Sequence, residues 1–537
     1  MGTKKWRCTI CGEEFEGDTP PEVCPICNVG SEFFEEIKDE KKVIPPVDKV
    51  EKKKVISGKA WKCTVCDEIF SEDEVPDTCP VCGVGKELFE EIEIKPVSEI
   101  TWKCTVCSEM IDAEECPIIC PVCGAGREAF EKIEKKNENL DLNKKEKVVI
   151  IGGGIAAISA ADAVRSKNKM AEIEIISKEN IMPYYRTMLT EYLYADMTEE
   201  KLKIKKDKWY EEKNIKLITG DTVVSVAAKD KKVSLSSGRE CSYDKLILAT
   251  GSECFVPPIK NAALDGVFTI RSMKDTENVK EYVKKCKRAV VIGGGVLGLE
   301  AAWGLKELGL DVSVIEMMQR ILPKQLDEKG SKMLEQAIVR SGVKVYKGVV
   351  VDHLEGDKKV SSVVLEKGEH IMADLVVISA GILPNKQLAV DIGIHTGRGI
   401  IVNEKMETSE KDIYACGDAA EYEGKVIGLW QVAMEQGKTA GLNASGDNAV
   451  YKEQIQPLNF DGMNIKLISI GMIGNGKECE EFIEDIDTKK SIYKKLYFEE
   501  NKLKGAILIG DVSKGITLIK SVRENAEKDV VLGKIYS

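Results

Sequence analysis

Residues 147–167 read KVVIIGGGIAAISAADAVRSK, a strand–turn–helix pattern that indicates the fold class of most of the chain. The mostly apolar start predicts a buried strand, the glycines a tight turn, and the alanine-rich run a helix. Gly152, Gly154 and Ala157 make a G-x-G-x-x-A turn. Glycine there lets the backbone approach a pyrophosphate, and the helix N-terminus supplies N–H donors. We therefore expect a dinucleotide-binding unit that continues with the strand EIEIIS.

A second copy of the pattern begins at residue 289 with AVVIGGGVLGLEAAWGLKELG and continues with the strand DVSVIE. One glycine turn is a modest signal, but two in correct strand–helix context predict two dinucleotide folds. The last residue of that strand is an acid, which accepts hydrogen bonds from the ribose hydroxyls of NADH and repels a 2′-phosphate. NADH is therefore favoured over NADPH. The expected ligands of this nucleotide are Gly293, Gly295, Gly298, Glu300 and Glu316.

The corresponding acidic position of the first unit is displaced. Ser177 ends the second strand, and Glu179 comes two residues later. Either side chain can bind an adenine ribose, so both remain candidates.

Upstream, a four-cysteine pattern occurs three times, and each copy has two C-x-x-C knuckles separated by twelve residues. Four thiolates in a tetrahedral cage select iron or zinc over hard cations. The spacing alone leaves both metals open. The predicted ligands are Cys8, Cys11, Cys24 and Cys27, then Cys63, Cys66, Cys79 and Cys82, then Cys104, Cys107, Cys120 and Cys123.

Composition narrows the class of protein. The 537 residues are 43% hydrophobic and 31% charged, as in multidomain globular proteins. The net charge is −12, and the first 140 residues, with 19 Lys+Arg and 31 Asp+Glu, hold all of that excess. Neither a basic nucleic-acid surface nor a long apolar segment is evident, so we expect no nucleic-acid or membrane partner. The start has no apolar leader, which favours a reducing, cytoplasmic location.

The same patterns predict a multidomain chain. We place metal modules at 1–37, 58–93 and 99–134. The first nucleotide domain covers 146–265 and 373–450, the second covers 266–372, and a small α+β domain covers 451–537.

Two strand-end segments resemble those of the FAD/NAD pyridine-nucleotide reductases, flavoproteins with two Rossmann-like domains. They are LILATG, which ends in Thr250 and Gly251, and IYACGDAAE, which contains Gly417 and Asp418. The resemblance implies that the first unit binds FAD and that the aspartate hydrogen-bonds the flavin ribityl chain.

Two further segments extend this resemblance. VVISAGILPN, which contains Gly381, is similar to a strand that lies close to bound NAD in the family. PYYRTMLTEYL is similar to a flavin-side segment of the rubredoxin-reductase branch, which implies that Arg186 lies near the FAD pyrophosphate.

The cysteine repeats resemble rubredoxin, in the short-spaced form found in rubrerythrins. Each copy has a tryptophan two residues before its first cysteine and a phenylalanine seven residues after its last. The resemblance implies one iron ion per rubredoxin-like module, with zinc as the alternative.

The absence of a flavin-side cysteine pair distinguishes this chain from disulfide reductases. Disulfide reductases of this superfamily carry C-x4-C or C-x-x-C beside the flavin, and residues 140–537 contain neither. We expect cysteines 116, 241, 254, 286, 416 and 479 to be small packing or surface residues rather than reactive ones.

The resemblance implies an NAD(P)H:rubredoxin oxidoreductase-type enzyme that uses FAD. Electrons pass from NADH through FAD to three Fe(Cys)4 centres in cis, and on to an unidentified redox protein, such as an oxygen- or peroxide-detoxifying metalloprotein. The alternative is an NADH diaphorase or oxidase whose four-cysteine modules are zinc ribbons that dock partners.

Overall fold

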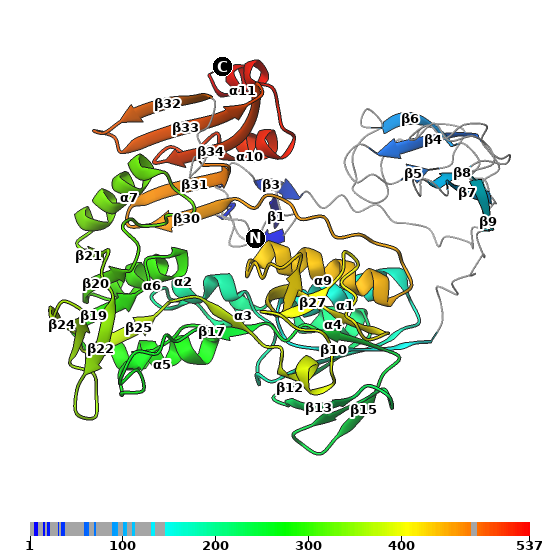
Figure 1. Ribbon diagram of the computed structural model, residues 1–537, viewed down its shortest axis with the longest axis horizontal. Helices are drawn as coiled ribbons and strands as arrows, with labels where there is room; N and C mark the ends of the chain where they lie inside the picture. Colours follow the sequence, from blue (N-terminus) through cyan, green and yellow to red (C-terminus); the bar gives the residue numbers. More distant parts are fainter. Residues whose placement is uncertain are drawn as a thin grey trace. The chain divides into compact units, whose positions relative to one another are not determined.

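The computed structural model describes residues 145–473 and 481–536, and in the N-terminal part residues 5–8, 14–16, 19–21, 31, 34–37, 58–63, 69–70, 89–94, 100–104, 110–112 and 130–134. The described residues fall into an N-terminal unit, up to residue 134, and a second unit from residue 145 onward (Figure 1).

The N-terminal unit contains three small antiparallel sheets with the same strand order. They are β2-β1-β3, β5-β4-β6 and β8-β7-β9. In each sheet the repeat's tryptophan pairs with the apolar residue four positions after the second cysteine: Trp6 with Phe15, Trp61 with Phe70, and Trp102 with Ile111. The three repeats therefore share one backbone register. The strands are β1 Lys5–Cys8, β2 Glu14–Glu16, β3 Phe34–Ile37, β4 Gly58–Cys63, β5 Ile69–Phe70, β6 Phe89–Ile94, β7 Ile100–Cys104, β8 Met110–Asp112 and β9 Phe130–Glu134.

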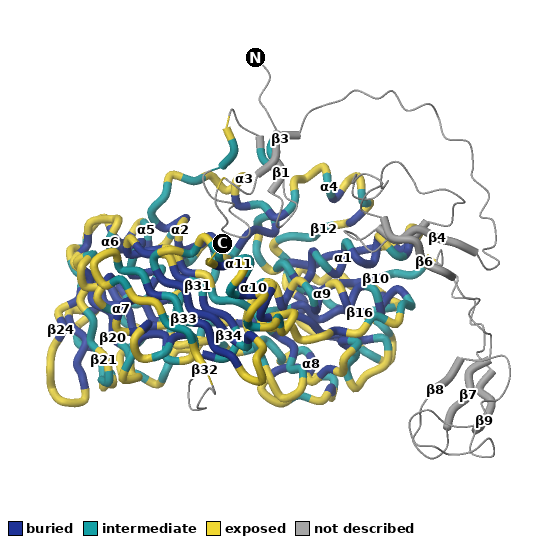
Figure 2. Tube along the Cα trace, turned by 90° about the horizontal axis from the view of Figure 1, so that it is seen from above, coloured by how far each residue is buried: buried dark blue, intermediate teal, exposed yellow. Residues whose placement is uncertain are grey.

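The first nucleotide unit is built on a five-stranded parallel sheet of order β12-β11-β10-β16-β28. Its strands are mostly apolar because helices and loops cover both faces, and Figure 2 shows β10 and β16 among the buried segments. Helices α1 and α9 pack side by side on this sheet (Figure 1). The elements are β10 Lys147–Ile151, α1 Ile155–Lys167, β11 Glu172–Ser177, β12 Ile215–Thr219, β16 Lys245–Leu248, β28 Ile413–Ala415 and α9 Trp430–Ala444.

The second nucleotide unit repeats this layout, with a parallel sheet of order β18-β25-β19-β20-β21. Alternate residues of β19 face different cores: Val291 packs toward the α6 and α7 side, and Val290 packs toward the meander β22–β24. Our predicted boundary at residue 372 is wrong, because β25 follows it and pairs with β19. The elements are β18 Val267–Phe268, α5 Met273–Val283, β19 Arg288–Ile292, α6 Val296–Glu307, β20 Asp311–Glu316, α7 Glu328–Arg340, β21 Lys344–Lys347 and β25 Leu375–Ile378.

Smaller elements connect the two sheets. Each nucleotide unit carries a three-stranded meander, β13–β15 or β22–β24, and the ribbon β17/β26 joins the units. Their bounds are η4 Arg186–Met188, α2 Leu189–Tyr192, α3 Glu199–Leu202, α4 Asp207–Glu212, β13 Val223–Ala227, β14 Lys232–Leu235, β15 Glu240–Ser242, β17 Ser252–Cys254, β22 Val351–Glu355, β23 Ser362–Leu365, β24 His370–Met372, β26 Ile382–Pro384, α8 Gln387–Asp391, β27 Ile400–Val402, η5 Gly417–Ala419 and β29 Ala420–Tyr422.

The C-terminal domain is an antiparallel sheet of order β30-β31-β34-β33-β32 with two helices, which confirms the predicted α+β class. One sheet face, with Phe460 and Tyr493, joins the core of the second nucleotide unit, and the other, with Phe498, packs on α10 and α11. The elements are β30 Leu458–Gly462, β31 Ile465–Gly471, β32 Glu481–Asp487, β33 Ile492–Glu499, β34 Lys502–Ile509, α10 Gly515–Arg523 and α11 Lys528–Ile535.

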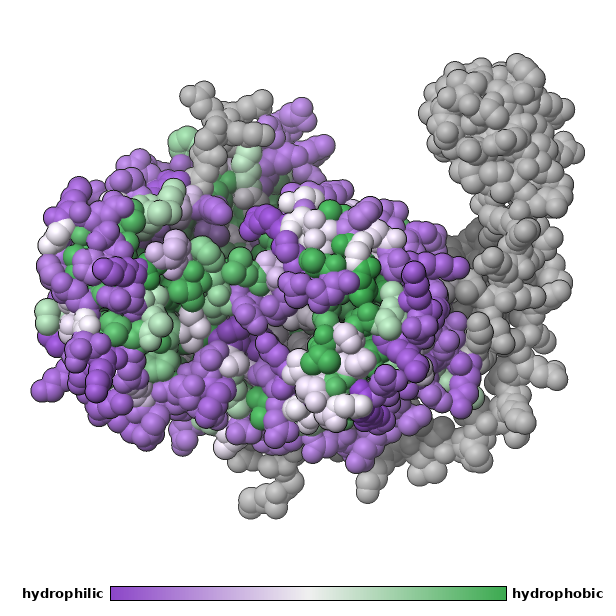
Figure 3. Space-filling model, turned by 60° about the horizontal axis from the view of Figure 1, so that its bottom comes forward, coloured by the Kyte–Doolittle hydropathy of each residue, from purple (hydrophilic) through white to green (hydrophobic). Residues whose placement is uncertain are grey.

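Among the described helices, none combines the length and the apolar character that crossing a bilayer requires. Figure 3 shows one face of the molecule, on which hydrophobic side chains gather toward the middle and hydrophilic ones toward the margin.

Candidate active site

A single cavity of about 1910 Å³ joins segments from both nucleotide units and the C-terminal domain. Pockets for one drug-sized ligand usually measure about 300–1,000 Å³, so this one has room for parts of two dinucleotides. Nine of the ten predicted FAD ligands line it, and the tenth, Ala157, is buried behind the turn in α1. Of the predicted NAD ligands only Glu300 lines it. Three exposed leucines, Leu297, Leu383 and Leu429, also lie on its wall.

The two glycine turns have matching geometry. Gly152 has φ +135° and Gly293 has φ +119°. A Cβ at Gly152 would overlap the carbonyl oxygen of Ala249, directly after β16, and a Cβ at Gly293 would overlap that of Ser379, directly after β25. A Cβ at Gly154 or Gly295 would meet no described atom within 4 Å. The backbone at each helix N-terminus is therefore accessible, as a pyrophosphate requires. Both turns fit a dinucleotide.

Ser177 and Glu179 occupy different positions relative to the first turn. The Ser177 side chain lies against Gly153, the middle glycine, just as the Glu316 side chain lies against Gly294 in the second turn. Glu316 Oε2 there accepts a hydrogen bond from the Gly294 N–H at 2.8 Å. Ser177 is therefore the counterpart of Glu316, and the position we left open in the first unit carries a hydroxyl.

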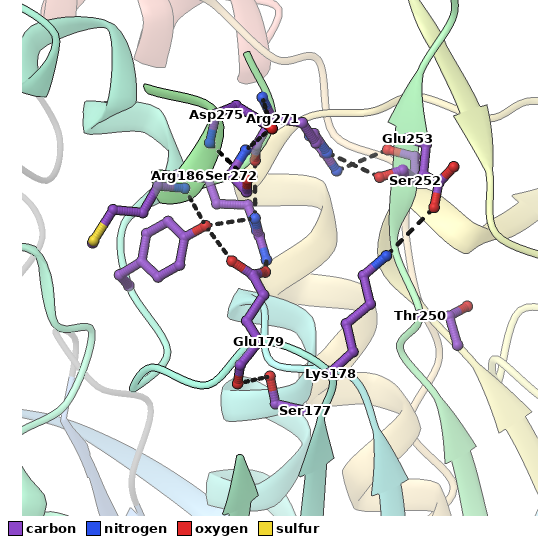
Figure 4. Close-up of polar contacts among 12 residues, drawn as sticks. Ser177, Lys178, Glu179, Arg186, Thr250, Ser252, Glu253, Arg271, Ser272 and Asp275 are labelled. Carbon is purple, nitrogen blue, oxygen red and sulfur yellow. Dashed lines mark hydrogen bonds and ion pairs between the residues drawn. The ribbon is translucent and has the colours of Figure 1, made fainter. Parts of the chain in front are cut away.

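Glu179 holds an arginine instead. Its carboxylate forms an ion pair with Arg186 and accepts a hydrogen bond from the Tyr184 hydroxyl at 2.7 Å. Arg186 also donates to Tyr184 Oη at 2.8 Å and to the carbonyl of Arg271 at 2.9 Å (Figure 4). Burial, and then the negative charge of Glu179, raise the pKa of Tyr184, so this phenol stays neutral. The network fixes a guanidinium on the cavity wall.

Asp418 is also paired with an arginine. Arg271 donates to Asp418 Oδ2 at 2.7 Å, and the Ser252 hydroxyl donates to the same oxygen at 2.9 Å. The neighbouring Gly417 N–H is held by Gln436 Oε1 of α9 at 2.9 Å. Sequence reasoning missed Arg271, although it directly precedes Ser272, whose side chain forms a capping box with Asp275 at the start of α5.

The predicted strand-end residues Thr250 and Gly251 lie where the two units meet. Thr250 Oγ1 donates to the Asn385 carbonyl at 2.6 Å, and Asn385 Nδ2 donates back to the Thr250 carbonyl at 3.0 Å. Gly381, with φ +115°, precedes β26 on the facing segment. These contacts connect residues 249–251, which follow β16, to the segment of residues 382–385.

Glu300 is the one predicted NAD ligand inside the cavity. It lies on α6, one turn beyond Val296, and its Oε2 accepts a hydrogen bond from Thr190 Oγ1 at 2.9 Å. Burial raises its pKa to about 7. Gly298, on the same helix, packs against the carbonyl of Gly293, which lets α6 approach its own turn closely.

Two cysteines line the cavity, Cys254 and Cys416, and both are free thiols. Burial raises the pKa of Cys416 to about 12 and also raises that of Cys254, so neither is an activated thiolate. Cys241 and Cys286 are free thiols as well. These four fit the packing role that we expected, whereas Cys116 and Cys479 lie outside the described residues.

The predicted metal cages are described only in part. Cys8, Cys63 and Cys104 end the central strands of the three small sheets, each opposite the late phenylalanine of its repeat. The other nine predicted ligands lie outside the described residues.

Comparison with known families gives three matches along the chain. Residues 146–437 match the pyridine nucleotide-disulphide oxidoreductases, and residues 458–526 match the rubredoxin NAD+ reductase C-terminal domain. Residues 6–35, 61–90 and 102–131 each match the rubredoxin-like domain of rubrerythrin.

Individual relatives agree with these matches. The chain is 37% identical over 386 residues to an NADH-rubredoxin oxidoreductase of Clostridium acetobutylicum, covering 72% of this chain and 97% of that one. The crystal structure of NADH:rubredoxin oxidoreductase from Clostridium acetobutylicum matches with a TM-score of 0.61 and 35% identity, over 73% of this chain and all of the other. A ferredoxin reductase from Rhodopseudomonas palustris matches with a TM-score of 0.66 and 26% identity, over 71% and 96%.

The paired glycine turns, the shared cavity and these matches agree on one assignment. The chain belongs to the pyridine nucleotide-disulphide oxidoreductase family, as an FAD-dependent oxidoreductase with three rubredoxin-like modules at its N-terminal end.

Proposed function

We propose that this chain passes electrons from NADH, by way of FAD, to iron centres in its own three modules and from there to an external redox protein. The observation that carries the proposal is the combination in one chain of a cavity between two dinucleotide turns and three four-cysteine modules. Tethering of donor and acceptor raises their effective concentration without any new contact.

The residues of the first unit fit FAD. We assign its pyrophosphate to the turn of Gly152 and Gly154 with Arg186, and its ribityl chain to Asp418. Ser177 is assigned to the adenine ribose, with Glu179 as the anchor of Arg186. The remaining proposed FAD ligands are Ala157, Thr250, Gly251 and Gly417.

The second unit fits NADH. We assign the pyrophosphate to Gly293, Gly295 and Gly298, the adenine ribose to Glu316, and the nicotinamide end to Glu300 and Gly381. FAD, when bound, accepts a hydride and returns electrons singly, which matches a two-electron donor to one-electron iron acceptors. One NADH then reduces two Fe(III) ions and releases one proton.

Each module holds one Fe ion in our proposal, through its four cysteines. Rubredoxin-like modules suggest iron, and four-thiolate cages also accept zinc. If the modules hold zinc, they are zinc ribbons that dock partner proteins, and the enzyme is limited to a diaphorase or oxidase reaction. The cavity supports the electron-transfer reading over disulfide reduction, because its two thiols, Cys254 and Cys416, are not activated.

We further propose that the external acceptor is a metalloprotein that reduces oxygen or peroxide. A cytoplasmic location follows from the chemistry of the cages, since their thiolates must stay reduced to bind metal.

An anaerobic NADH titration of the purified chain, with metal analysis, tests the proposal. We expect iron in the modules, bleaching of an iron–thiolate chromophore together with the flavin, and uptake of more than two electrons per chain. Flavin bleaching alone, with iron present, would contradict electron transfer in cis. Zinc that persists in protein produced with added iron would favour the docking alternative.

A further inference from the structure

One end of the cavity combines carboxylates and aromatic rings from three parts of the fold. Glu191 comes from α2, Glu300 from α6 and Asp461 from β30, the first strand of the C-terminal domain. Tyr194 and Trp303 line the same cavity beside them. Sequence reasoning found only Glu300 in this group.

The negative charge of this end is largely uncompensated. Burial, then repulsion from Asp461, raise the pKa of Glu191, while burial and repulsion from Glu191 raise that of Glu300. In the described part of the chain neither Glu191 nor Glu300 forms an ion pair, whereas Asp461 pairs with Lys466 at 3.3 Å. The hydrogen bond from Thr190, the residue before Glu191, brings α2 and α6 together here. A positive charge placed between these neighbouring carboxylates would relieve their repulsion and lower both pKa values.

The position of this end of the cavity along α6 indicates which ligand would bring that positive charge. Val296, Glu300 and Trp303 lie on one face of α6, and α6 begins at the turn assigned to the NADH pyrophosphate. A dinucleotide anchored there extends its nicotinamide into the cavity. This step depends on the proposed NADH site. The nicotinamide ring is neutral in NADH and carries one positive charge in NAD+.

We propose that Glu191 and Glu300, flanked by Tyr194 and Trp303, stabilise the positive charge that the nicotinamide ring gains as it gives up its hydride. In that step the C4–H bond of NADH breaks, the hydride leaves with both electrons for the flavin, and the ring becomes cationic. The carboxylates exchange no proton. They act because fixed negative charge near a developing cation lowers its free energy, and aromatic faces add to the attraction.

Binding to the oxidised, FAD-loaded full chain tests this role without turnover. The probes are NAD+, with a cationic ring, and 1,4,5,6-tetrahydro-NAD, with a neutral one. We expect Glu191→Gln and Glu300→Gln each to weaken NAD+ binding by about tenfold and binding of the neutral probe by less than about twofold. Glu191→Lys should weaken NAD+ binding further. Glu307→Gln is the matched control, because Glu307 is exposed on the same helix and does not line the cavity.

The pH dependence provides a second readout. The charged and titratable groups that interact with Glu300 are Glu191 and Tyr194, from the α2 segment. Asp461 of the β30–β31 hairpin, which pairs with Lys466, acts on Glu191 and Tyr194, and Glu307 follows Glu300 on its own helix. Because the pKa of Glu300 is raised to about 7, NAD+ binding should tighten as pH rises through that value. The neutral probe should show no such change, and Glu300→Gln should abolish it.

Equal weakening for both probes, or no weakening for either, would overturn the charge role, and so would a pH-independent NAD+ affinity in the unmodified chain. FAD content and thermal unfolding confirm that each variant folds. Module metal has no part in this measurement, so finding zinc would contradict the proposed electron transfer and leave this result standing.

Discussion

Gly152 and Gly293 are positions where an added side chain would disturb the turn that we propose holds a pyrophosphate. Both have a positive φ, and each faces a carbonyl oxygen that leaves no space for a Cβ. Strain of this kind costs about 1–3 kcal/mol per residue. The two turns are equivalent in geometry but belong to different sheets, so each can be altered without changing the other.

We predict that Gly293→Ala weakens NADH binding at least about tenfold while FAD stays bound, because the added methyl displaces the second turn only. Gly152→Ala is the reciprocal control and should lose FAD. Flavin content by absorbance and KM for NADH separate the two. Loss of FAD in Gly293→Ala would show that the turns are not independent.

Glu179 and Ser177 lead to a second prediction at this scale. Glu179→Gln removes the charge that holds Arg186, and hydrogen bonds to charged groups contribute about 1.5–3 kcal/mol, so FAD affinity should fall about tenfold or more. Ser177→Ala should change FAD affinity by less than about threefold, since only one neutral hydroxyl is lost. Equilibrium FAD titration of the apoprotein checks both. A larger effect at Ser177 would reverse the roles that we assign.

At the scale of elements, sequence patterns predicted what depends on local chemistry. The continuous apolar strands and the glycine turns predicted both nucleotide units. The tryptophans at equal spacing predicted three copies of one module, and the three small sheets do share one register. Long-range packing was not predictable. The strand β25 pairs with β19, which begins 87 residues earlier at Arg288, and β30 brings Asp461 to the cavity, because tertiary contacts decide both. Arg271 was missed for the same reason.

The crossing of α1 and α9 connects helix packing to the proposed FAD site. A Cβ at Gly437 would overlap the carbonyl oxygen of Ala156, in the first turn of α1, and one at Gly441 would overlap that of Ala160. Two glycines four residues apart thus let the helices touch backbone to backbone. The same helix, α9, holds the Gly417 N–H through Gln436.

We predict that Gly437→Ala destabilises the chain by about 1–3 kcal/mol, the usual effect of overpacking, and loosens FAD. Met434→Ala, at a side chain 41% exposed on the same helix, is the control and should stay within about 0.5 kcal/mol. Denaturant unfolding and flavin retention on dilution measure the two effects. Full stability of Gly437→Ala would mean that the helices can separate without affecting the site.

At the scale of the whole molecule, Asp327 joins the C-terminal domain to the second nucleotide unit. It caps α7 by accepting from the Gly330 N–H at 2.8 Å, and it accepts from Tyr493 at 2.6 Å and Tyr497 at 3.0 Å. Lys495 pairs with it at 3.0 Å. One carboxylate therefore organises a junction between two domains.

We predict that Asp327→Asn lowers the free energy of unfolding by about 2–4 kcal/mol at pH 7, since it removes the nearer of the two carboxylates that pair with Lys495 and leaves only Glu484 at 3.5 Å. Burial opposes ionisation of Asp327, but its hydrogen bonds and Lys495 prevail and lower the pKa. A lowered folded-state pKa stabilises above the unfolded value, so the difference between the two proteins should shrink as pH falls below about 4. Thermal unfolding from pH 3 to 7 would show this, and a pH-independent difference would contradict it.

The order of the modules along the chain yields the last prediction. Residues 135–146 connect β9 of the third module to β10, and at about 3.3–3.6 Å per residue they span at most about 40 Å. The first glycine turn follows β10, a strand of five residues and about 16 Å, which is shorter than this connection. The first module is connected through many more residues, so we expect the third module to have the highest effective concentration at the proposed FAD site. Cys104→Ser should therefore slow reduction of the other two modules severalfold in stopped-flow traces, whereas Cys8→Ser, the matched change in the first module, should leave the third unaffected. Equal rates in Cys104→Ser and the unmodified chain would show that the modules accept electrons independently rather than in series.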